Sequence, residues 1–536
     1  MNSQQFREAA HAAIEESKTT PNKPLHSPIP APPALRTPLT SPQSHRIQRD
    51  PPHPPRPQRR PPGYLAPLLP TTAPHTPEPF SQIQPDISAH IMPGLTHWQH
   101  PNFMAFFPAT TSYPSMLAEL YSAAFTAPAF NWLCSPAVTE LETVVLDWVA
   151  QMLGLPEEFL SKGEGGGVIQ GTASEAIAVC MVAARERMLG RMLEREGLKE
   201  GTEEWEERKG ELRGRLVALG SEQAHSSTQK GAIVAGTREV LERCKREGKV
   251  PYYLTVSLGT TSTCAVDAFE EIAGVLKEWP DVWVHVDAAY AGAALVLPEY
   301  QHLTKAFVHF DSFDMNMHKW LLTNFDASCL FVRRRHDLTS ALSITPSYLR
   351  NTFSDSGLVT DYRDWQIPLG RRFRALKIWF VLRSYGIDGL QSYIRNHIEL
   401  GELFHSLVKG RPDLFSVLTG PAFALTVITV VPKRPQQMRN ASKPDPRHEA
   451  FTNDFTPDAE KQALFDANAV TKEVYELVNS RGEIFITSGV VNGTYAIRIV
   501  SANANTEEKY IRRAFEILVE TAEEVLGKGE ANGSAN

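Results

Sequence analysis

One lysine in the sequence has the surroundings that an amine nucleophile needs. Lys319 directly follows His318 and comes just before an apolar run, residues 320–322. Burial in such a place disfavours the charged form of an amine and so lowers its pKa. A neutral lysine amine can form a Schiff base with an aldehyde. Taken alone, the same residues also fit an ordinary lysine on the protein surface.

A carboxylate upstream of Lys319 extends this chemistry. Residues 283–286 predict a buried strand that delivers Asp287 at its end. Taken alone, an aspartate at a strand end is more often a cap or turn residue. A Schiff-base lysine together with a carboxylate for a pyridinium nitrogen is, however, the basic set of groups for pyridoxal phosphate (PLP). The two residues together therefore predict a PLP site.

A short turn could hold the phosphate of such a cofactor. Residues 171–174, Gly-Thr-Ala-Ser, follow a predicted strand and precede an alanine-rich helix. Backbone N–H groups at a helix N-terminus, together with the helix dipole, favour a bound anion. By itself the turn fits a plain helix cap equally well. Because it comes ahead of Asp287 and Lys319, we interpret it as the phosphate site of PLP.

With these motifs in this order, the chain resembles the group II PLP-dependent amino-acid decarboxylases, and most of all the aromatic-L-amino-acid decarboxylases. The resemblance runs from about residue 62 to about residue 525 and begins at a Pro-Gly-Tyr-Leu sequence. It implies fold type I of the PLP-dependent enzymes, an aspartate aminotransferase-like α/β fold. Such a fold has a mostly parallel sheet in its large domain and a smaller C-terminal α/β domain.

The resemblance also implies roles for particular residues. Lys319 would carry PLP, Asp287 would keep a proton on the ring nitrogen, and His225 would stack on the ring. Tyr348, in a predicted mobile loop, would return a proton to the substrate or form an essential part of that relay. The implied cofactor-binding residues are Thr172, Ala173, Ser174, His225, Thr261, Asp287, Ala289, Asn316, His318 and Lys319. No metal is expected.

Aromatic residues near the start of the globular part suggest either a core or the wall of a substrate pocket. The pattern alone favours a core, whereas the resemblance favours a pocket. The substrate-binding residues that it implies are Trp98, Phe106, Pro108, Ala109, Phe130 and Gly370. Ala109 stands where the family usually has threonine, which weakens a polar contact. Phe130 would reach into the neighbouring subunit's site, so we expect a homodimer with shared active sites.

The expected substrate is an aromatic L-amino acid of the tryptophan, 5-hydroxytryptophan or dopa class, and the products are the amine and CO2. In plant relatives a small residue at the position of Gly370 accompanies indolic substrates, and serine accompanies phenolic ones. Tyr348 and His225 favour simple decarboxylation over aldehyde synthesis. An aromatic aldehyde synthase, a histidine decarboxylase and a non-catalytic remnant or incorrectly assembled chain stay open as alternatives.

The length of 536 residues predicts two or three structural units. We expect an N-terminal segment 1–80, a large PLP-binding domain 81–408 and a small C-terminal domain 409–536. Residues 21–60 are rich in proline, which lacks the backbone donor of helices and sheets, so they predict a disordered insert. Residues 432–457 predict a polar disordered loop. Compared with the family, the chain is shortened where Thr237 follows Gly236.

The composition argues against several other classes of protein. The net charge of −7 gives no reason to propose a nucleic-acid partner. The five cysteines are scattered without a Cys-X-X-Cys pair, which favours reduced thiols in the cytoplasm over a disulfide framework or a zinc site. No apolar stretch is long enough to cross a bilayer, and the first residues lack the apolar core of a secretory signal. We therefore expect a cytoplasmic enzyme with a small-molecule substrate and no membrane partner.

Overall fold

The computed structural model of the protein describes residues 61–220, 237–343, 359–432 and 457–533, together with Glu8, His11 and Phe353. The chain forms two compact units. One unit comprises Met1–Pro28, Pro33–Pro108 and His397–Asn536, and the other comprises Ile29–Pro32 and Ala109–Asn396. The predicted insert 21–60 and nearly all of the predicted loop 432–457 lie outside the described residues. The domain boundaries expected at residues 80 and 408 stay predictions.

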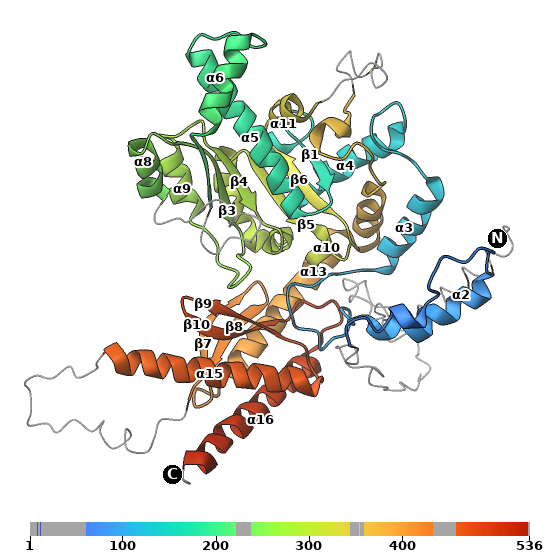
Figure 1. The fold of residues 1–536 in the computed structure, drawn as a ribbon, viewed down its shortest axis with the longest axis vertical. Helices are drawn as coiled ribbons and strands as arrows, with labels where there is room; N and C mark the ends of the chain where they lie inside the picture. The colour runs from blue at the N-terminus through green and yellow to red at the C-terminus, as the bar shows by residue number, and fades with distance from the viewer. Residues whose placement is uncertain are drawn as a thin grey trace, which may run out of the picture. The chain divides into compact units, whose positions relative to one another are not determined.

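The unit formed by Ala109–Asn396 is built on a six-stranded sheet with the order β1-β6-β5-β4-β3-β2 (Figure 1). Its strands are β1 (Gly166–Gln170), β2 (Leu216–Gly220), β3 (Val250–Ser257), β4 (Trp283–Asp287), β5 (Ser312–Asn316) and β6 (Ser328–Val332). The four strands β2 to β5 run parallel, whereas β6 is antiparallel to both β5 and β1. The sheet is therefore mixed but mostly parallel, and the α/β class expected from the sequence is confirmed.

Helices surround this sheet and make its strands almost entirely buried. They are α3 (Tyr113–Phe125), α4 (Pro136–Met152), α5 (Ala173–Arg195), α6 (Glu203–Arg213), α8 (Thr237–Arg246), α9 (Phe269–Leu276), α10 (Met317–Trp320) and α11 (Arg335–Leu342). Shorter helical turns are η4 (Glu157–Phe159), η5 (Ala291–Val296), η6 (Pro298–His309) and η8 (Tyr362–Trp365). Strands covered on both faces are buried along nearly their whole length, as the parallel strand β3 and the antiparallel strand β6 are here.

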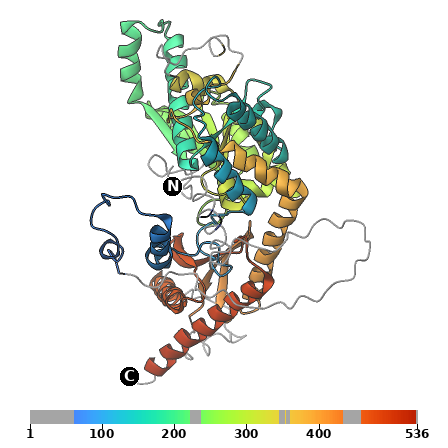
Figure 2. The ribbon, with the colours of Figure 1, turned by 90° about the vertical axis from the view of Figure 1, so that its right-hand side faces the viewer.

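Helix α5 lies along one face of the sheet (Figures 1 and 2). Its small residues Ala176, Cys180 and Ala183 belong to one buried cluster with Tyr253 of β3 and Trp283 of β4. Small side chains let the helix backbone approach the strands closely, while the large rings on the sheet fill the remaining space. This packing fixes the start of α5 beside the end of β1, where the phosphate site is predicted.

The other unit contains a four-stranded antiparallel sheet with the order β7-β8-β10-β9. Its elements are η1 (Ala66–Leu68), α2 (Phe80–Asp86), η2 (Ile87–Ile91), η3 (Met92–Gly94), β7 (Phe415–Ala422), β8 (Leu425–Val430), α15 (Pro457–Arg481), β9 (Thr487–Val491), β10 (Thr494–Val500) and α16 (Glu508–Gly533). Helix α13 (Ala375–Lys409) passes from one unit to the other, and its helical geometry is broken at Gly386. Backbone hydrogen bonds from Met104 to Phe485 and from Phe485 to Asn102 join the earlier part of the chain to this unit.

Candidate active site

The predicted lysine and aspartate come together at the carboxyl ends of β4 and β5. Asp287 is the last residue of β4, and the chain leaves β5 at Asn316 to enter α10, which carries Lys319. Burial lowers the pKa of the Lys319 amine, while the nearby carboxylates of Asp287 and Asp314 and Cys264 act in the opposite direction. Part of Lys319 stays accessible from outside. A lysine of this kind is poised to react as a neutral amine.

The backbone that follows β4 orients the carboxylate of Asp287. Asp287 is buried, and its Oδ1 accepts a hydrogen bond of 3.1 Å from the Ala289 N–H. The Ala289 carbonyl in turn accepts a 3.0 Å hydrogen bond from the Asn316 N–H. These bonds tie together three residues that were predicted to bind the cofactor. Asn316 Oδ1 is buried and has no hydrogen-bond partner in the described part of the chain, as expected where a polar ligand belongs.

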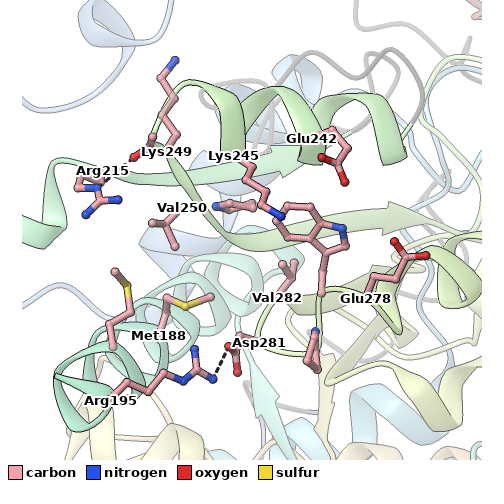
Figure 3. Close-up of a pocket in the computed structure, with 15 residues that line it drawn as sticks. Met188, Arg195, Arg215, Glu242, Lys245, Lys249, Val250, Glu278, Asp281 and Val282 are labelled. Carbon is pink, nitrogen blue, oxygen red and sulfur yellow. Dashed lines mark hydrogen bonds and ion pairs between the residues drawn. The ribbon is translucent and has the colours of Figure 1, made fainter. Parts of the chain in front are cut away.

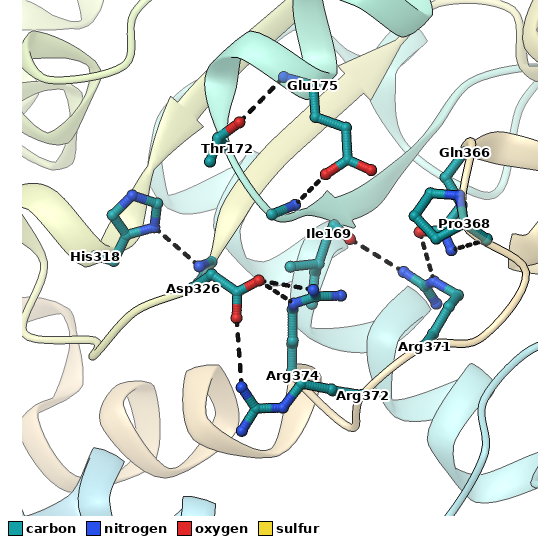
Figure 4. A network of polar contacts seen from close by, with 12 residues as sticks. Ile169, Thr172, Glu175, His318, Asp326, Gln366, Pro368, Arg371, Arg372 and Arg374 are labelled. Carbon is teal, nitrogen blue, oxygen red and sulfur yellow. Dashed lines mark hydrogen bonds and ion pairs between the residues drawn. The ribbon is translucent and has the colours of Figure 1, made fainter. Parts of the chain in front are cut away.

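His318 is held in one protonation state beside the lysine. Its Nδ1 accepts a 2.9 Å hydrogen bond from the Ala327 N–H, which leaves the ring proton on Nε2 (Figure 4). Burial and the neighbouring charge of Lys319 lower the pKa of His318 to about 4. The imidazole is therefore neutral near pH 7, and its Nε2–H can donate a hydrogen bond to an acceptor such as a phosphate oxygen.

The predicted phosphate turn lies at the start of α5. Thr172 caps this helix, and its Oγ1 accepts a 3.1 Å hydrogen bond from the Glu175 N–H. The Gly171 N–H donates to Glu175 Oε2 at 2.9 Å, and a Cβ on Gly171 would lie 2.9 Å from the same oxygen. Glycine therefore permits the close turn, and the side chains of Thr172 and Ser174 face outward. The first amides of a 23-residue helix suit a phosphate.

A loop after β3 brings Thr261 into the same neighbourhood. The Leu258 N–H donates a 2.9 Å hydrogen bond to the carbonyl of Asp287, which anchors the loop to the end of β4. The hydroxyls of Thr260 and Thr263 form a 3.0 Å hydrogen bond across the turn, which stabilises it. Thr261 is exposed at the tip of this turn. The cofactor residues on β4, the loop after β3 and α10 are thus joined by backbone bonds.

Two of the predicted catalytic residues lie outside the described residues. His225 falls within 221–236 and Tyr348 within 344–352. Their assigned roles, stacking on the ring and proton return, therefore stay predictions.

The residues predicted to bind the substrate divide between the two compact units. Trp98, Phe106 and Pro108 belong to one unit, and Ala109, Phe130 and Gly370 to the other. The rings of Trp98 and Phe106 stack with their centroids 5.6 Å apart. Pro108 is buried, and Ala109 and Phe130 are partly buried. Gly370 is exposed, and a Cβ there would meet no atom of the described residues within 4 Å, so these residues give no steric reason for glycine.

A network of buried and half-buried ion pairs supports this region, and no sequence motif predicted it. Arg371 donates to both oxygens of Glu142, at 2.8 Å and 2.6 Å. It also donates to the Ile169 carbonyl of β1 at 3.2 Å (Figure 4). Arg374 donates to Asp326 Oδ2 at 2.7 Å. Burial alone would raise the pKa of Asp326, but Arg374 lowers it below its usual value.

These ion pairs connect residues that are far apart in the sequence. Glu142 also accepts a 2.9 Å hydrogen bond from the Ile169 N–H, so one carboxylate ties α4 to the end of β1. The Asp326 and Arg374 pair fixes the loop after α10 beside the phosphate turn (Figure 4). The members of these pairs are far apart in the sequence, so no short motif indicates them.

A separate hollow of about 490 Å³ lies at the other end of the strands (Figure 3). Its lining includes Arg215, Val250 and Val282, which precede or begin β2, β3 and β4. Lys319 follows the opposite, carboxyl end of β5, so this hollow is not the cofactor site. Arg195 and Asp281 form an ion pair of 2.7 Å within its wall. None of the residues predicted to bind cofactor or substrate lines it.

An amine of lowered pKa within the field of a carboxylate, at the carboxyl ends of parallel strands, fits a PLP-dependent enzyme of the α/β class. Residues 62–430 match the family described as the pyridoxal-dependent decarboxylase conserved domain. The chain belongs to this family, the group II PLP-dependent decarboxylases. It is therefore a PLP-dependent carboxy-lyase, as predicted. The site fits the cofactor, because it has an amine, a carboxylate, a helix N-terminus and the open acceptor of Asn316.

Relatives and solved structures agree with this assignment. The chain is 40% identical over 489 residues to phenylacetaldehyde synthase of Arabidopsis thaliana, covering 87% of this chain and 91% of the relative. It is 48% identical over 367 residues to aromatic-L-amino-acid decarboxylase of Bos taurus, covering 65% of this chain and 74% of the relative. The crystal structure of Oryza sativa TDC with PLP and tryptamine matches with a TM-score of 0.80 and 33% identity. The match covers 98% of this chain and 99% of that structure's chain. These matches confirm the predicted fold type I.

Proposed function

We propose that this protein converts an aromatic L-amino acid of the tryptophan, 5-hydroxytryptophan or dopa class to the corresponding amine and CO2. The observation that carries the proposal is Lys319, whose buried amine has a lowered pKa and lies within the field of Asp287. The relatives named for aromatic amino-acid decarboxylation and the structural neighbour containing tryptamine support the substrate class. Gly370, exposed and without a side chain, agrees with an indolic substrate.

Bound PLP supplies an aldehyde that an amine can attack and a ring that withdraws electrons as a carboxylate leaves. Lys319 would present the neutral amine that forms the covalent attachment. Asp287, oriented by the Ala289 N–H, would keep a proton on the ring nitrogen. The first amides of α5 would hold the phosphate, and His318 would donate from Nε2.

Two further roles rest on the sequence alone. His225 would stack on the ring, and Tyr348 would return a proton to the substrate carbon that has lost CO2. An aromatic aldehyde synthase is the second candidate function, because a relative with that kind of name is 40% identical to this chain. Tyr348 favours the decarboxylase, because a phenol is a proton donor that a phenylalanine at the same position could not replace.

Product analysis tests this proposal. The purified protein, loaded with PLP, would receive tryptophan, 5-hydroxytryptophan, dopa, tyrosine and histidine separately, and amine, aldehyde and peroxide would be quantified. We expect amine without aldehyde, formed fastest from tryptophan, 5-hydroxytryptophan or dopa. Aldehyde with peroxide, amine from histidine alone, or no product from any substrate would contradict the proposal. A Tyr348→Phe variant is the matched control, and we expect it to release aldehyde in place of part of the amine.

We also propose that the enzyme is a homodimer with shared active sites. Helix α3 exposes Leu117, Leu120, Tyr121 and Phe125 between 46% and 57%, and an apolar surface of this kind marks a binding interface. Light scattering during gel filtration should give twice the chain mass of 59.6 kDa. A Leu117→Asp, Leu120→Asp double variant should give the single mass. A monomeric parent protein with full activity would refute the proposal.

We further propose a cytoplasmic location, as expected from the composition. None of the described helices is long and apolar enough to cross a membrane. Cell fractionation tests the location, and enzyme recovered in the membrane fraction after a salt wash would contradict it.

A further inference from the structure

A second carboxylate lies beside the aspartate that is proposed to hold the ring nitrogen. Asp314 of β5 is paired in register with Asp287 of β4. Residues paired in this way on neighbouring strands project from the same face of a sheet. His285 lies two positions before Asp287 on the same strand and therefore shares that face. Both Asp314 and His285 are completely buried.

Asp314 and His285 form an ion pair inside the sheet layer. His285 Nε2 lies 3.0 Å from Asp314 Oδ1, and His285 Nδ1 lies 2.8 Å from the hydroxyl of Ser312. The same Ser312 oxygen accepts a 2.7 Å hydrogen bond from the indole N–H of Trp283. Every partner is buried, so the imidazole cannot turn away to find water. The geometry places the carboxylate of Asp314 at a fixed position relative to β4.

The two partners stabilise each other's charged forms against burial. Burial works against a charged imidazole, but Cys180 and Asp314 raise the pKa of His285. Burial raises the pKa of Asp314 to about 6, and His285 limits that rise, so the carboxylate is charged above this pH. A buried carboxylate without such a partner would take up a proton. The pair therefore keeps a negative end at Asp314 and a positive end at His285.

The negative end of this pair acts on the candidate active site. Asp287 and Asp314 both raise the pKa of the Lys319 amine against the effect of burial. The charge of Asp287 in turn affects Asp314. The titratable groups that face the pair from the surrounding elements are Cys180, Tyr253, Asp287, Lys319 and Cys329. Among them Lys319 is the cation and Asp287 the other carboxylate, so Asp314 faces both groups that would contact PLP.

We propose that Asp314, held by His285, is a positioning residue. It governs how readily the nitrogen of Lys319 holds a proton, both in the apoenzyme and in the enzyme to which PLP is attached. The proposal rests on the roles proposed above for Lys319 and Asp287. Asp314 does not touch the cofactor in this scheme. It adds negative potential at Lys319, and the His285 partner keeps that charge in place.

The test is a pH titration of the absorption spectrum of the PLP-loaded enzyme without substrate. An Asp314→Asn variant keeps the size and polarity of the side chain and removes its charge. We expect the pH at the midpoint of the colour change to fall by about one unit, because a charge at this range is weakened by the protein interior but not abolished. A Ser328→Ala variant is the matched control. It removes a neutral hydrogen-bond donor 3.4 Å from Asp314 Oδ2 and leaves the charge, so its midpoint should stay unchanged.

A second measurement follows the rate at which the apoenzyme binds PLP. Attachment of PLP needs the neutral amine of Lys319, so loss of the negative charge should increase the neutral fraction. At neutral pH we expect Asp314→Asn to bind PLP up to tenfold faster than the parent protein, since one unit of pKa is a tenfold change in that fraction. If Asp314→Asn does not fold, as judged by thermal unfolding, Asp314→Ser removes the same charge with less bulk.

The outcomes separate this inference from the proposed function. A Lys319→Ala variant that keeps the colour of the parent enzyme would refute the role of Lys319, and with it the inference. If Lys319→Ala loses the colour while a folded Asp314→Asn shows the parent midpoint and binding rate, only the inference is overturned. A purely structural role for Asp314 would lower the unfolding temperature in both Asp314→Asn and Asp314→Ser without moving the midpoint.

Discussion

Charged side chains gather at both ends of the six-stranded sheet, but burial lowers the pKa of bases at one end, whereas arginines lower the pKa of Asp281 at the other. At the carboxyl ends of β4 and β5, burial lowers the pKa of Lys319 and keeps His318 neutral. At the amino ends, around the hollow in Figure 3, Arg195 is paired with Asp281 but leaves 63% of its side chain exposed. Water and salt weaken such a pair, whereas the protein interior strengthens one. The difference shows that burial, and not the number of charges, makes a reactive site.

The strongest test of this comparison removes one lysine from each end. We expect Lys319→Ala to lose activity by on the order of a thousandfold or more, because the nucleophile is absent. Lys245→Ala, in the wall of the hollow, should keep the parent activity. Steady-state kinetics with thermal unfolding as a check of folding would measure both. Equal losses in the two variants would remove the distinction between the ends of the sheet.

The ion pair of Glu142 and Arg371 should be the most costly one to break. Both side chains are 1% exposed. Arg371→Met leaves the Glu142 carboxylate buried without its partner, which should cost about 3–5 kcal/mol of unfolding free energy. Combining it with Glu142→Gln should recover a substantial part of that loss. Denaturant unfolding measures both variants, and a single variant as stable as the double variant would contradict the assignment.

His318 should make the folded state sensitive to acid. Its pKa is lowered from 6.5 to about 4, so the unfolded chain binds the proton more readily between these values. Stability contributed by neutral His318 is therefore present above pH 6.5 and lost as the pH falls toward 4. The loss amounts to about 3 kcal/mol at most. Denaturant unfolding from pH 7 to 4 should show a smaller decrease for His318→Asn than for the parent protein, and equal decreases would refute the expectation.

The smallest effect is expected at the exposed end of the sheet. Arg195→Ala removes one of the two arginines that pair with Asp281. Exposed ion pairs contribute about 0–1 kcal/mol, so stability should change by no more than that and the difference should shrink further in high salt. Activity should match that of the parent. A loss above 2 kcal/mol would show that the amino end is more protected from solvent than its exposure indicates.

Several features of the site could be predicted from the sequence because they depend on short stretches. The residues around Lys319 and Asp287 and the turn at 171–174 each lie within a few positions of a strand end or a helix start. Chain direction and local backbone geometry then place them, and the parallel order of β3, β4 and β5 brings their carboxyl ends to one edge. The phosphate turn at the start of α5 is predicted for the same reason.

The supporting pairs could not be predicted in this way, because their members are distant in the sequence. His285 with Asp314, Glu142 with Arg371 and Asp326 with Arg374 are joined only after the strands and helices have packed. Nothing in a local pattern indicates which histidine will meet which carboxylate. The sequence by itself determined the family and the cofactor and predicts Lys319 as the reactive lysine, since these follow from residue types and short spacings. Only the tertiary structure decided which charges are buried beside Lys319, because burial and dielectric surroundings are properties of the packed chain.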